Sequence, residues 1–207
     1  MENEIKQLPE VSMGRKIWLE FKDILAGVAF PFMLSLVLST TIILYASYSS
    51  QDLGVSLVAL IGGELMLGAA FLIFGRANGS AAYKKTVSNA QKRELNSTDE
   101  RVLCHTGEYA LWKGVLIGFI PCIPFVIFQT IELIFSNVVC SFCLKYICGW
   151  AYYPFHYLGE KFQALNYVIV IFPVAMHVIG YHLGKLKQIK IQEEIAQTLD
   201  GNKRKKK

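Results

Sequence analysis

The sequence predicts an all-α integral membrane protein, a bundle of four transmembrane helices with both termini in the cytoplasm. Two observations predict this fold: the chain contains long apolar segments, and Lys and Arg are distributed unevenly between them. Hydrophobic residues make up 53% of the 207 residues and charged residues 18%, whereas soluble chains are about a quarter charged. Four spans leave little room for a separate soluble domain, so we expect one membrane domain over residues 1–207.

Four apolar segments have about the length that crosses a bilayer. They are residues 25–45, 55–74, 115–138 and 165–184. A helix rises about 1.5 Å per residue, so about 20 residues cross the roughly 30 Å of hydrocarbon. The first segment is longer than the apolar region of a cleavable signal peptide, and polar residues of mixed charge precede it. We therefore expect it to remain in the protein as a span.

Lys and Arg alternate between the segments that flank the spans. Four lie in residues 1–24, none in 46–54, seven in 76–113, two in 139–164 and eight in 185–207. Connections rich in Lys and Arg stay on the cytoplasmic side of a membrane. The alternation therefore predicts that both termini and the 76–113 loop are cytoplasmic, and that the other two loops lie outside.

The parts of the chain outside the spans also show helical patterns. Residues 1–24 include apolar side chains at helical spacing among charges, which predicts an amphipathic leader helix at the inner interface. Residues 97–100 match a capping box, which starts a short helix in the 76–113 loop. We expect the 185–207 tail to continue the fourth helix and to end in a basic segment that contacts anionic lipid at the cytoplasmic face. The basic residues flank apolar spans, a pattern that argues against nucleic acid as a partner.

The 139–164 loop is crowded with aromatic residues and holds few charges. We interpret it as an aromatic belt that lies on the outer leaflet. The alternative is an outer lid or a platform that faces a ligand. Pro154 argues against one unbroken helix through this segment.

Polar residues in the four spans fall within a turn or two of one depth. By helix rise, Glu64, Ser35 and His177 lie near the midplane, Gln129 is shallower and Glu132 is closest to the outer surface. An ionisable group at that depth is costly and normally faces the bundle interior with a partner. One hypothesis is a proton or cation site, with Glu64 as the titrating carboxylate and His177 as its partner. The other is a hydrogen-bond network that only holds the helices together.

Prolines and glycines add local features to the spans. Pro121 and Pro124 should produce the largest local distortion of a helix, because each removes a backbone hydrogen bond. Glycines four residues apart allow two helices to approach closely. Such pairs are Gly114/Gly118 and Gly180/Gly184, with Gly75/Gly79 at the exit of the second span. They could pack within one chain, or against a protein partner or a second copy.

Three of the five cysteines lie at or beyond the outer end of the third span. Cys140 and Cys143 could form an exchangeable disulfide that Cys148 resolves. In architecture alone, this arrangement resembles membrane thiol oxidases that pass electrons from a disulfide to a quinone. The alternative is that the cysteines are apolar filling on a helix. The spacing of His and Cys matches no metal site, so we predict neither a metal nor a cofactor.

The sequence therefore favours a non-enzymatic membrane protein that acts as an accessory, assembly or interaction subunit. The first alternative is a small proton- or cation-coupled transporter that uses Glu64 and His177. The second is a membrane thiol–disulfide oxidoreductase that uses Cys140 and Cys143. No glycine-rich phosphate loop follows a strand in the sequence. The expected location is the plasma membrane of a bacterium, or the endoplasmic reticulum if the source is eukaryotic.

Overall fold

The computed structural model describes residues 11–48, 53–95, 98–156 and 165–205, with side chains for 11–41, 61–95, 98–153 and 165–198. Within these ranges the chain forms helices and no strands. Four helical segments are long and apolar enough to cross a membrane: Met13–Thr41, Ile61–Glu94, Leu111–Phe135 and Asn166–Thr198. This confirms the prediction of an all-α fold with four helices that are able to cross a membrane. Parts of the predicted leader, the outer loops and the C-terminal basic tail fall on residues 1–10, 49–52, 157–164 and 206–207, which lie outside the described residues.

The helices extend well beyond the predicted spans. In chain order they are α1 (Met13–Tyr48), α2 (Leu53–Glu94), α3 (Glu100–Leu103), α4 (Leu111–Phe119), the 3-10 turn η1 (Ile120–Cys122), α5 (Ile123–Phe135), α6 (Val138–Ile147), α7 (Gly149–His156) and α8 (Asn166–Lys205). The predicted leader helix and the first span form one helix, α1. Helix α2 has 42 residues and is therefore about 63 Å long, twice the thickness of the hydrocarbon.

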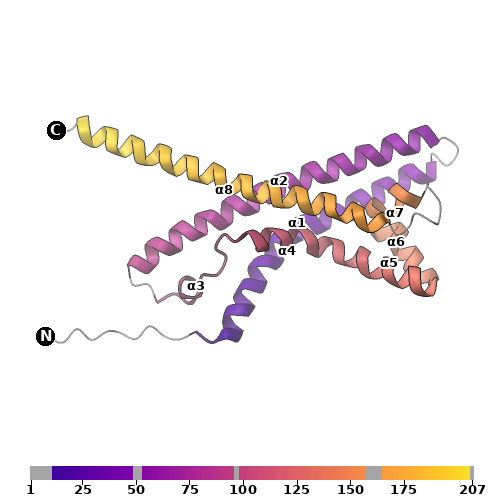
Figure 1. The fold of residues 1–207 in the computed structure, drawn as a ribbon, viewed down its shortest axis with the longest axis horizontal. Helices are drawn as coiled ribbons and strands as arrows, with labels where there is room; N and C mark the ends of the chain where they lie inside the picture. The colour runs from indigo at the N-terminus through magenta and orange to yellow at the C-terminus, as the bar shows by residue number, and fades with distance from the viewer. Residues whose placement is uncertain (1–10, 49–52, 96–97, 157–164, 206–207) are drawn as a thin grey trace.

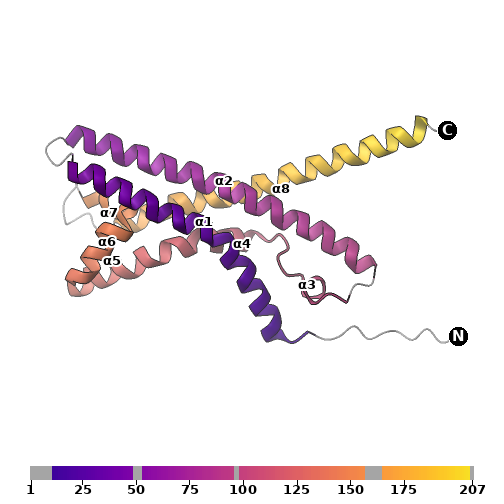
Figure 2. The same ribbon diagram turned by 180° about the vertical axis from the view of Figure 1, so that it is seen from behind.

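Helices α2 and α8 cross near their middles, and α1 and α4 lie beside the crossing (Figures 1 and 2). The start of α1, the ends of α2 and α8, and α3 lie at one end of the molecule (Figure 1). We call this the basic end, because the segments rich in Lys and Arg gather there. The end of α5, with α6 and α7, lies at the opposite end, which we call the aromatic end. The positive-inside bias predicts that the basic end faces the cytoplasm.

Glycines bring the backbones of α2 and α8 into contact. A Cβ atom added at Gly75 or Gly79 would overlap the carbonyl oxygen of His177 or Tyr181, and one at Gly180 or Gly184 would overlap that of Leu72 or Arg76. These contacts advance in the same direction along both helices, so α2 and α8 run parallel. Both glycine pairs are thus occupied within the chain. A partner could reach Gly180 and Gly184 only if α2 and α8 separated, and such an oligomer stays a prediction.

Helix α4 packs on another side of α8 through the third glycine pair. Gly114 lies against the ring of Tyr181, and Gly118 lies against the side chain of His177. Both of these α8 side chains are almost fully buried. Helix α8 therefore lies between α2 and α4, and small residues set the approach on both sides.

The prolines of the third span interrupt its helix as predicted. The 3-10 turn Ile120–Cys122 separates α4 from α5, with Pro121 inside it and Pro124 in the first turn of α5. Pro31 and Pro173, in contrast, lie inside the continuous helices α1 and α8. The third span is therefore the discontinuous one.

The outer segment does not form one unbroken helix, as predicted, but its break lies at Cys148 and not at Pro154. The backbone bends at Cys148, which ends α6, and α7 begins at the next residue and continues through Pro154. Glycine at position 149 follows a cysteine in a non-helical conformation. Pro154 lies near the end of α7, two residues before its last residue, His156.

The structure also corrects the interfacial belt for two of its aromatic residues. Trp150 and Tyr152 are 2% and 5% exposed and belong to the main hydrophobic core. Phe142 and Tyr146 on α6 are about half exposed, as a belt at the interface requires. Helix α7 thus inserts its aromatic side chains between the spans and closes the core at the aromatic end.

The short helix in the loop between α2 and α4 begins later than the predicted capping box. Helix α3 starts at Glu100, and the side chain of Asp99 accepts a hydrogen bond from the backbone of Arg101. Ser97, the predicted cap, lies outside the described residues. Asp99 serves as the N-cap, because its carboxylate reaches a free backbone donor of the first turn.

We expect Gly79→Ala to destabilise the fold, because the added methyl group would push α8 away from α2. Overpacking of this kind costs about 1–3 kcal/mol. The matched control is Gly62→Ala in the same helix, where no atom lies within 4 Å of the added carbon. The control should leave the thermal unfolding midpoint in detergent unchanged or slightly raised. Equal midpoints for the two variants would contradict the backbone contact.

Candidate functional site

A hydrogen-bond network joins all four spans on the basic side of the core. The Nδ1 atom of His177 on α8 lies 2.9 Å from the carbonyl oxygen of Gly114 on α4. Its Nε2 atom lies 3.4 Å from the amide nitrogen of Asn78 on α2. The same amide donates to the carbonyl oxygen of Gly27 on α1 at 3.2 Å. His177 is fully buried.

The geometry assigns the neutral form of the His177 ring. A carbonyl oxygen can only accept, so Nδ1 carries the proton and donates to Gly114. Nε2 then accepts one proton of the Asn78 amide, and the second amide proton goes to Gly27. Every polar atom of the imidazole is thereby satisfied, which is what a buried polar group requires.

This network differs from the pairing of Glu64 with His177 that the sequence suggested. His177 faces Gly75, and Glu64 lies eleven residues before Gly75 on α2. That distance is about 16 Å along the helix. The equal-depth argument failed because α8 begins deeper in the bundle than α2, so residues counted from the two helix starts do not lie level.

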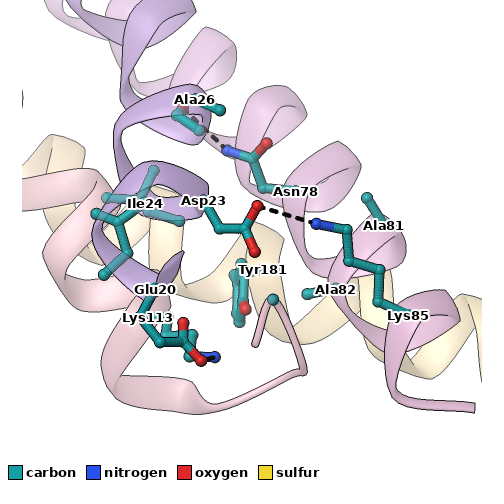
Figure 3. A pocket seen from close by; sticks show the side chains of 13 residues that line it. Glu20, Asp23, Ile24, Ala26, Asn78, Ala81, Ala82, Lys85, Lys113 and Tyr181 are labelled. Carbon is teal, nitrogen blue, oxygen red and sulfur yellow. Dashed lines mark hydrogen bonds and ion pairs between the residues drawn. The ribbon is translucent and has the colours of Figure 1, made fainter. Parts of the chain in front are cut away.

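A pocket of about 200 Å³, with both charged and apolar side chains in its lining, opens beside the network at the basic end. Figure 3 shows Asp23 of α1 and Lys85 of α2 pointing toward each other across it; their side chains form an ion pair at 3.2 Å. Glu20, Lys113, Asn78 and Tyr181 line the remaining walls. Four charged side chains favour water or a polar group here over a lipid chain.

The charged side chains around this pocket also link the helices. Lys113 on α4 is only 8% exposed, and its ammonium group donates to Glu20 on α1 and to the carbonyl oxygen of Glu108, both at 2.8 Å. Arg15 on α1 pairs with Glu100 on α3 at 3.1 Å, although both side chains are half exposed. Exposed pairs contribute little, whereas loss of one partner of a buried pair leaves an unpaired charge. Of these two ion pairs, Lys113–Glu20 is therefore the one whose loss would destabilise the fold more.

Glu108 docks the loop before α4 onto α2. Its carboxylate accepts hydrogen bonds from Arg93 and Asn89 of α2 and contacts the ring of His105. Burial alone would raise the pKa of Glu108, but the hydrogen bonds from Arg93, His105 and Asn89 outweigh it and hold the pKa below its ordinary value of about 4.5. Glu108 is therefore ionised at neutral pH, and this docking weakens only as the pH falls through the lowered pKa.

Glu64 lies on the aromatic side of the core, away from the hydrogen-bond network of His177. Among the described residues, neither of its carboxylate oxygens, both of which are buried, has a hydrogen-bond partner. It precedes Leu67 by one helical turn, and Leu67 is fully buried in the main core. An ionised carboxylate that is buried without a partner is very costly.

Two buried amides share this situation. Gln129 on α5 and Asn166 on α8 are both 0% exposed, and none of their side-chain nitrogen and oxygen atoms has a hydrogen-bond partner among the described residues. Gln129 follows the core residue Phe125 by one turn, and Asn166 precedes the core residue Val170 by one turn. Together with Glu64, they lie one turn from the same core toward the aromatic end. We call these three residues the outer polar layer.

The other polar residues singled out from the sequence are satisfied locally, at least in part. Ser35 donates to the carbonyl oxygen of Phe32 in its own helix. The following turn makes the interhelical contact instead: Ser39 donates to the carbonyl oxygen of Ile147 on α6 at 2.8 Å. Glu132 accepts a hydrogen bond from Ser141 across the turn between α5 and α6, and its second oxygen has no partner among the described residues.

The three outer cysteines lie around the bend between α6 and α7. Cys140 and Cys143 are on α6, and Cys148 ends it. All three are free thiols, and Cys140 and Cys148 are buried. Cys148 belongs to the main core, where it packs as a small apolar residue. Exchange chemistry at these cysteines stays a prediction, and their burial favours the apolar role.

Sequence reasoning missed several residues of these sites. Asn78, Glu20 and Asp23 were placed outside the apolar spans, yet they reach the interior because α1 and α2 are longer than the spans. Asn166 stands at the start of the fourth span, where a polar residue is normally solvated. The available signal was the glycine spacing: a pair at Gly75/Gly79 extends the packed part of α2 past Asn78.

No family model, curated protein or solved structure matches this chain.

We expect Asn78→Leu to lower the free energy of unfolding by about 1–3 kcal/mol, because it leaves the Nε2 atom of His177 buried without a donor. The matched control is Thr41→Val. Thr41 is exposed, and among the described residues its hydroxyl bonds only within its own helix, so the control should change the free energy by less than about 0.5 kcal/mol. Thermal unfolding in detergent measures both variants. If Asn78→Leu unfolded at the wild-type temperature, the network would not hold the spans together.

Proposed function

We propose that this protein is a small integral membrane protein that binds and moves protons or monovalent cations, with Glu64 as the ion-binding carboxylate. One observation carries the proposal: both oxygens of this carboxylate are buried in a membrane span and have no hydrogen-bond partner among the described residues. An ionisable group in this position is expensive for the fold, so it points to a function that requires it.

The outer polar layer gives Glu64 suitable neighbours. Gly68 packs against Phe172 of α8. Because α2 and α8 run parallel, the turn that holds Glu64 is therefore close in level to the turn that holds Asn166. Gln129 and Asn166 each contribute an amide oxygen, and carboxylate and amide oxygens are ligands that hard cations prefer. A bound cation or ordered water would satisfy these buried atoms, which otherwise cost about 1–3 kcal/mol each.

An apolar barrier separates this layer from the basic end. Leu67 and Phe71 of α2, and Cys122 and Phe125 of the third span, are all fully buried in the core. The 3-10 turn between α4 and α5 lies at the same barrier, because it ends at Cys122. Transporters commonly place a discontinuous helix next to the ion site, where it can change shape. The pocket beside Asp23 and Lys85 would then be the water-filled entrance on the cytoplasmic side.

A second candidate function is an accessory or interaction subunit, and the length of α8 favours it. This helix continues for about 30 Å beyond the part that a bilayer covers. Leu186 and Ile195 on this extension are 40% and 55% exposed. Helices in proteins take most of their stability from the packing of an apolar face, so a partner that covers these side chains would stabilise the extension. In both cases the proposed setting is a bacterial plasma membrane, or the endoplasmic reticulum of a eukaryote.

Ion flux in proteoliposomes tests the proposal directly. We expect the wild-type protein to pass protons or a monovalent cation. A pH-sensitive dye inside the vesicles measures the proton flux, and radioactive sodium or rubidium measures the cation flux. Glu64→Gln should abolish this flux, because the amide side chain can neither bind and release a proton near neutral pH nor neutralise the charge of a cation. The matched control is Glu132→Gln, which removes a carboxylate near the turn after α5 and should leave most of the flux.

Two results would contradict the proposal. One is wild-type protein that passes none of these ions. The other is Glu64→Gln protein that passes them at the wild-type rate. Thermal unfolding of each variant separates a lost ion site from a lost fold, and we expect Glu64→Gln to unfold at or above the wild-type temperature, since it removes a carboxyl group that is costly to bury.

A further inference from the structure

A groove runs between α2 and α8 at the basic end, where the two helices diverge beyond the glycine contacts. Its volume is about 530 Å³, and it is lined by Arg76, Leu183, Leu186, Lys187, Ile189, Lys190 and Glu193. A second hollow of about 340 Å³ shares Arg76 and Lys187 with it and adds Ile73, Ala77 and Ser80. The groove is separate from the pocket beside Asp23 and from the outer polar layer, since none of its residues lines those sites.

The charges of this groove are positive and unpaired. Arg76, Lys187 and Lys190 are exposed, and in the described part of the chain none of them forms an ion pair. Glu193 contributes the single negative charge, so the groove carries a net charge of about +2. The pairs around the other pocket, in contrast, are matched in charge. This groove therefore attracts an anion.

The groove begins with apolar side chains at the level where the apolar segments end, and its first cations follow one turn later. Ile73 and Leu183 lie at the ends of the second and fourth apolar segments and are 66% and 42% exposed. Arg76 and Lys187 follow one turn later on the same two helices. Apolar side chains thus contact the level of the lipid chains, and the cations reach the level of the headgroups. A soluble anion would contact only the cations and would leave the apolar side chains uncovered.

The packing of the helices fixes the distance between the cations. Gly184 lies against the backbone of Arg76, and Gln188 donates to the hydroxyl of Ser80 at 2.7 Å. Lys187 is next to Gln188 in the chain, so it is held close to the turn that begins with Arg76. The guanidinium and the ammonium group therefore belong to one site built from two helices, whereas Lys203 and Arg204 lie on α8 alone.

We propose that this groove is a specific binding site for one anionic phospholipid, whose phosphate contacts Arg76 and Lys187 and whose acyl chains cover Ile73 and Leu183. The site is distinct from the general attraction of the C-terminal basic residues for anionic lipid. It is also independent of ion transport, because it shares no residue with Glu64 and its neighbours.

Native mass spectrometry of the full-length protein in neutral detergent tests this site. Phosphatidylglycerol and phosphatidylcholine are added in turn, and the lipid retained per chain is counted. We expect one retained phosphatidylglycerol and no matching retention of phosphatidylcholine. The double variant Arg76→Gln with Lys187→Gln should reduce retention roughly 30-fold, since each cation near a lipid headgroup contributes about fivefold. The matched control, Lys203→Gln with Arg204→Gln, removes the same charge from the tail and should retain the lipid.

Three outcomes of these measurements would overturn the proposal. They are equal retention of the two lipids, a loss in the tail control as large as in the groove variant, and displacement of the lipid by glycerol phosphate, which offers the anion without acyl chains. Unfolding temperatures in detergent without lipid check that the double variant is folded. Should it not fold, Lys187→Gln alone provides the test, with an expected loss of roughly fivefold.

Discussion

The direct contact between the backbones of α2 and α8 determines most of this structure. Four glycines, Gly75, Gly79, Gly180 and Gly184, remove the side chains that would hold the helices apart. Apolar side chains give little net driving force between helices in a lipid environment, so close packing of this kind must supply much of it. Because the contacts repeat at the same spacing on both helices, they also fix the register of the two helices. A fold with larger residues at these positions would need a different crossing.

The register explains where the polar groups lie. It places His177 beside Asn78, so that the imidazole is fully satisfied and contributes to the packing of the bundle. It leaves Glu64 on the other side of an apolar barrier, where its oxygens have no partner among the described residues. A buried polar side chain that has hydrogen-bond partners stabilises the fold. One that lacks them costs stability, and it points to a ligand. The crossing also opens the cationic groove, because the helices must diverge beyond it.

The sequence predicts the number of spans and the existence of the glycine contacts, because both depend on local composition. It also places the distortion at Pro121, since proline acts through its own backbone. It does not predict which polar groups meet. That depends on where each helix starts relative to its neighbours, and α8 begins deeper than counting from its first apolar residue suggests. Burial of Trp150 was missed for a related reason: an aromatic residue near an interface and one that closes a core have the same local pattern.

The parallel register of α2 and α8 is the central claim, and cross-linking in the membrane measures it most directly. In a protein whose native cysteines are replaced, Ser80→Cys with Gln188→Cys brings two thiols into positions whose side chains are now in hydrogen-bond contact. A short bifunctional thiol reagent should join them within one chain at high yield. The pair Ser80→Cys with Val170→Cys, which an antiparallel crossing would bring closer, should not react. Efficient reaction of the second pair and none of the first would contradict the account.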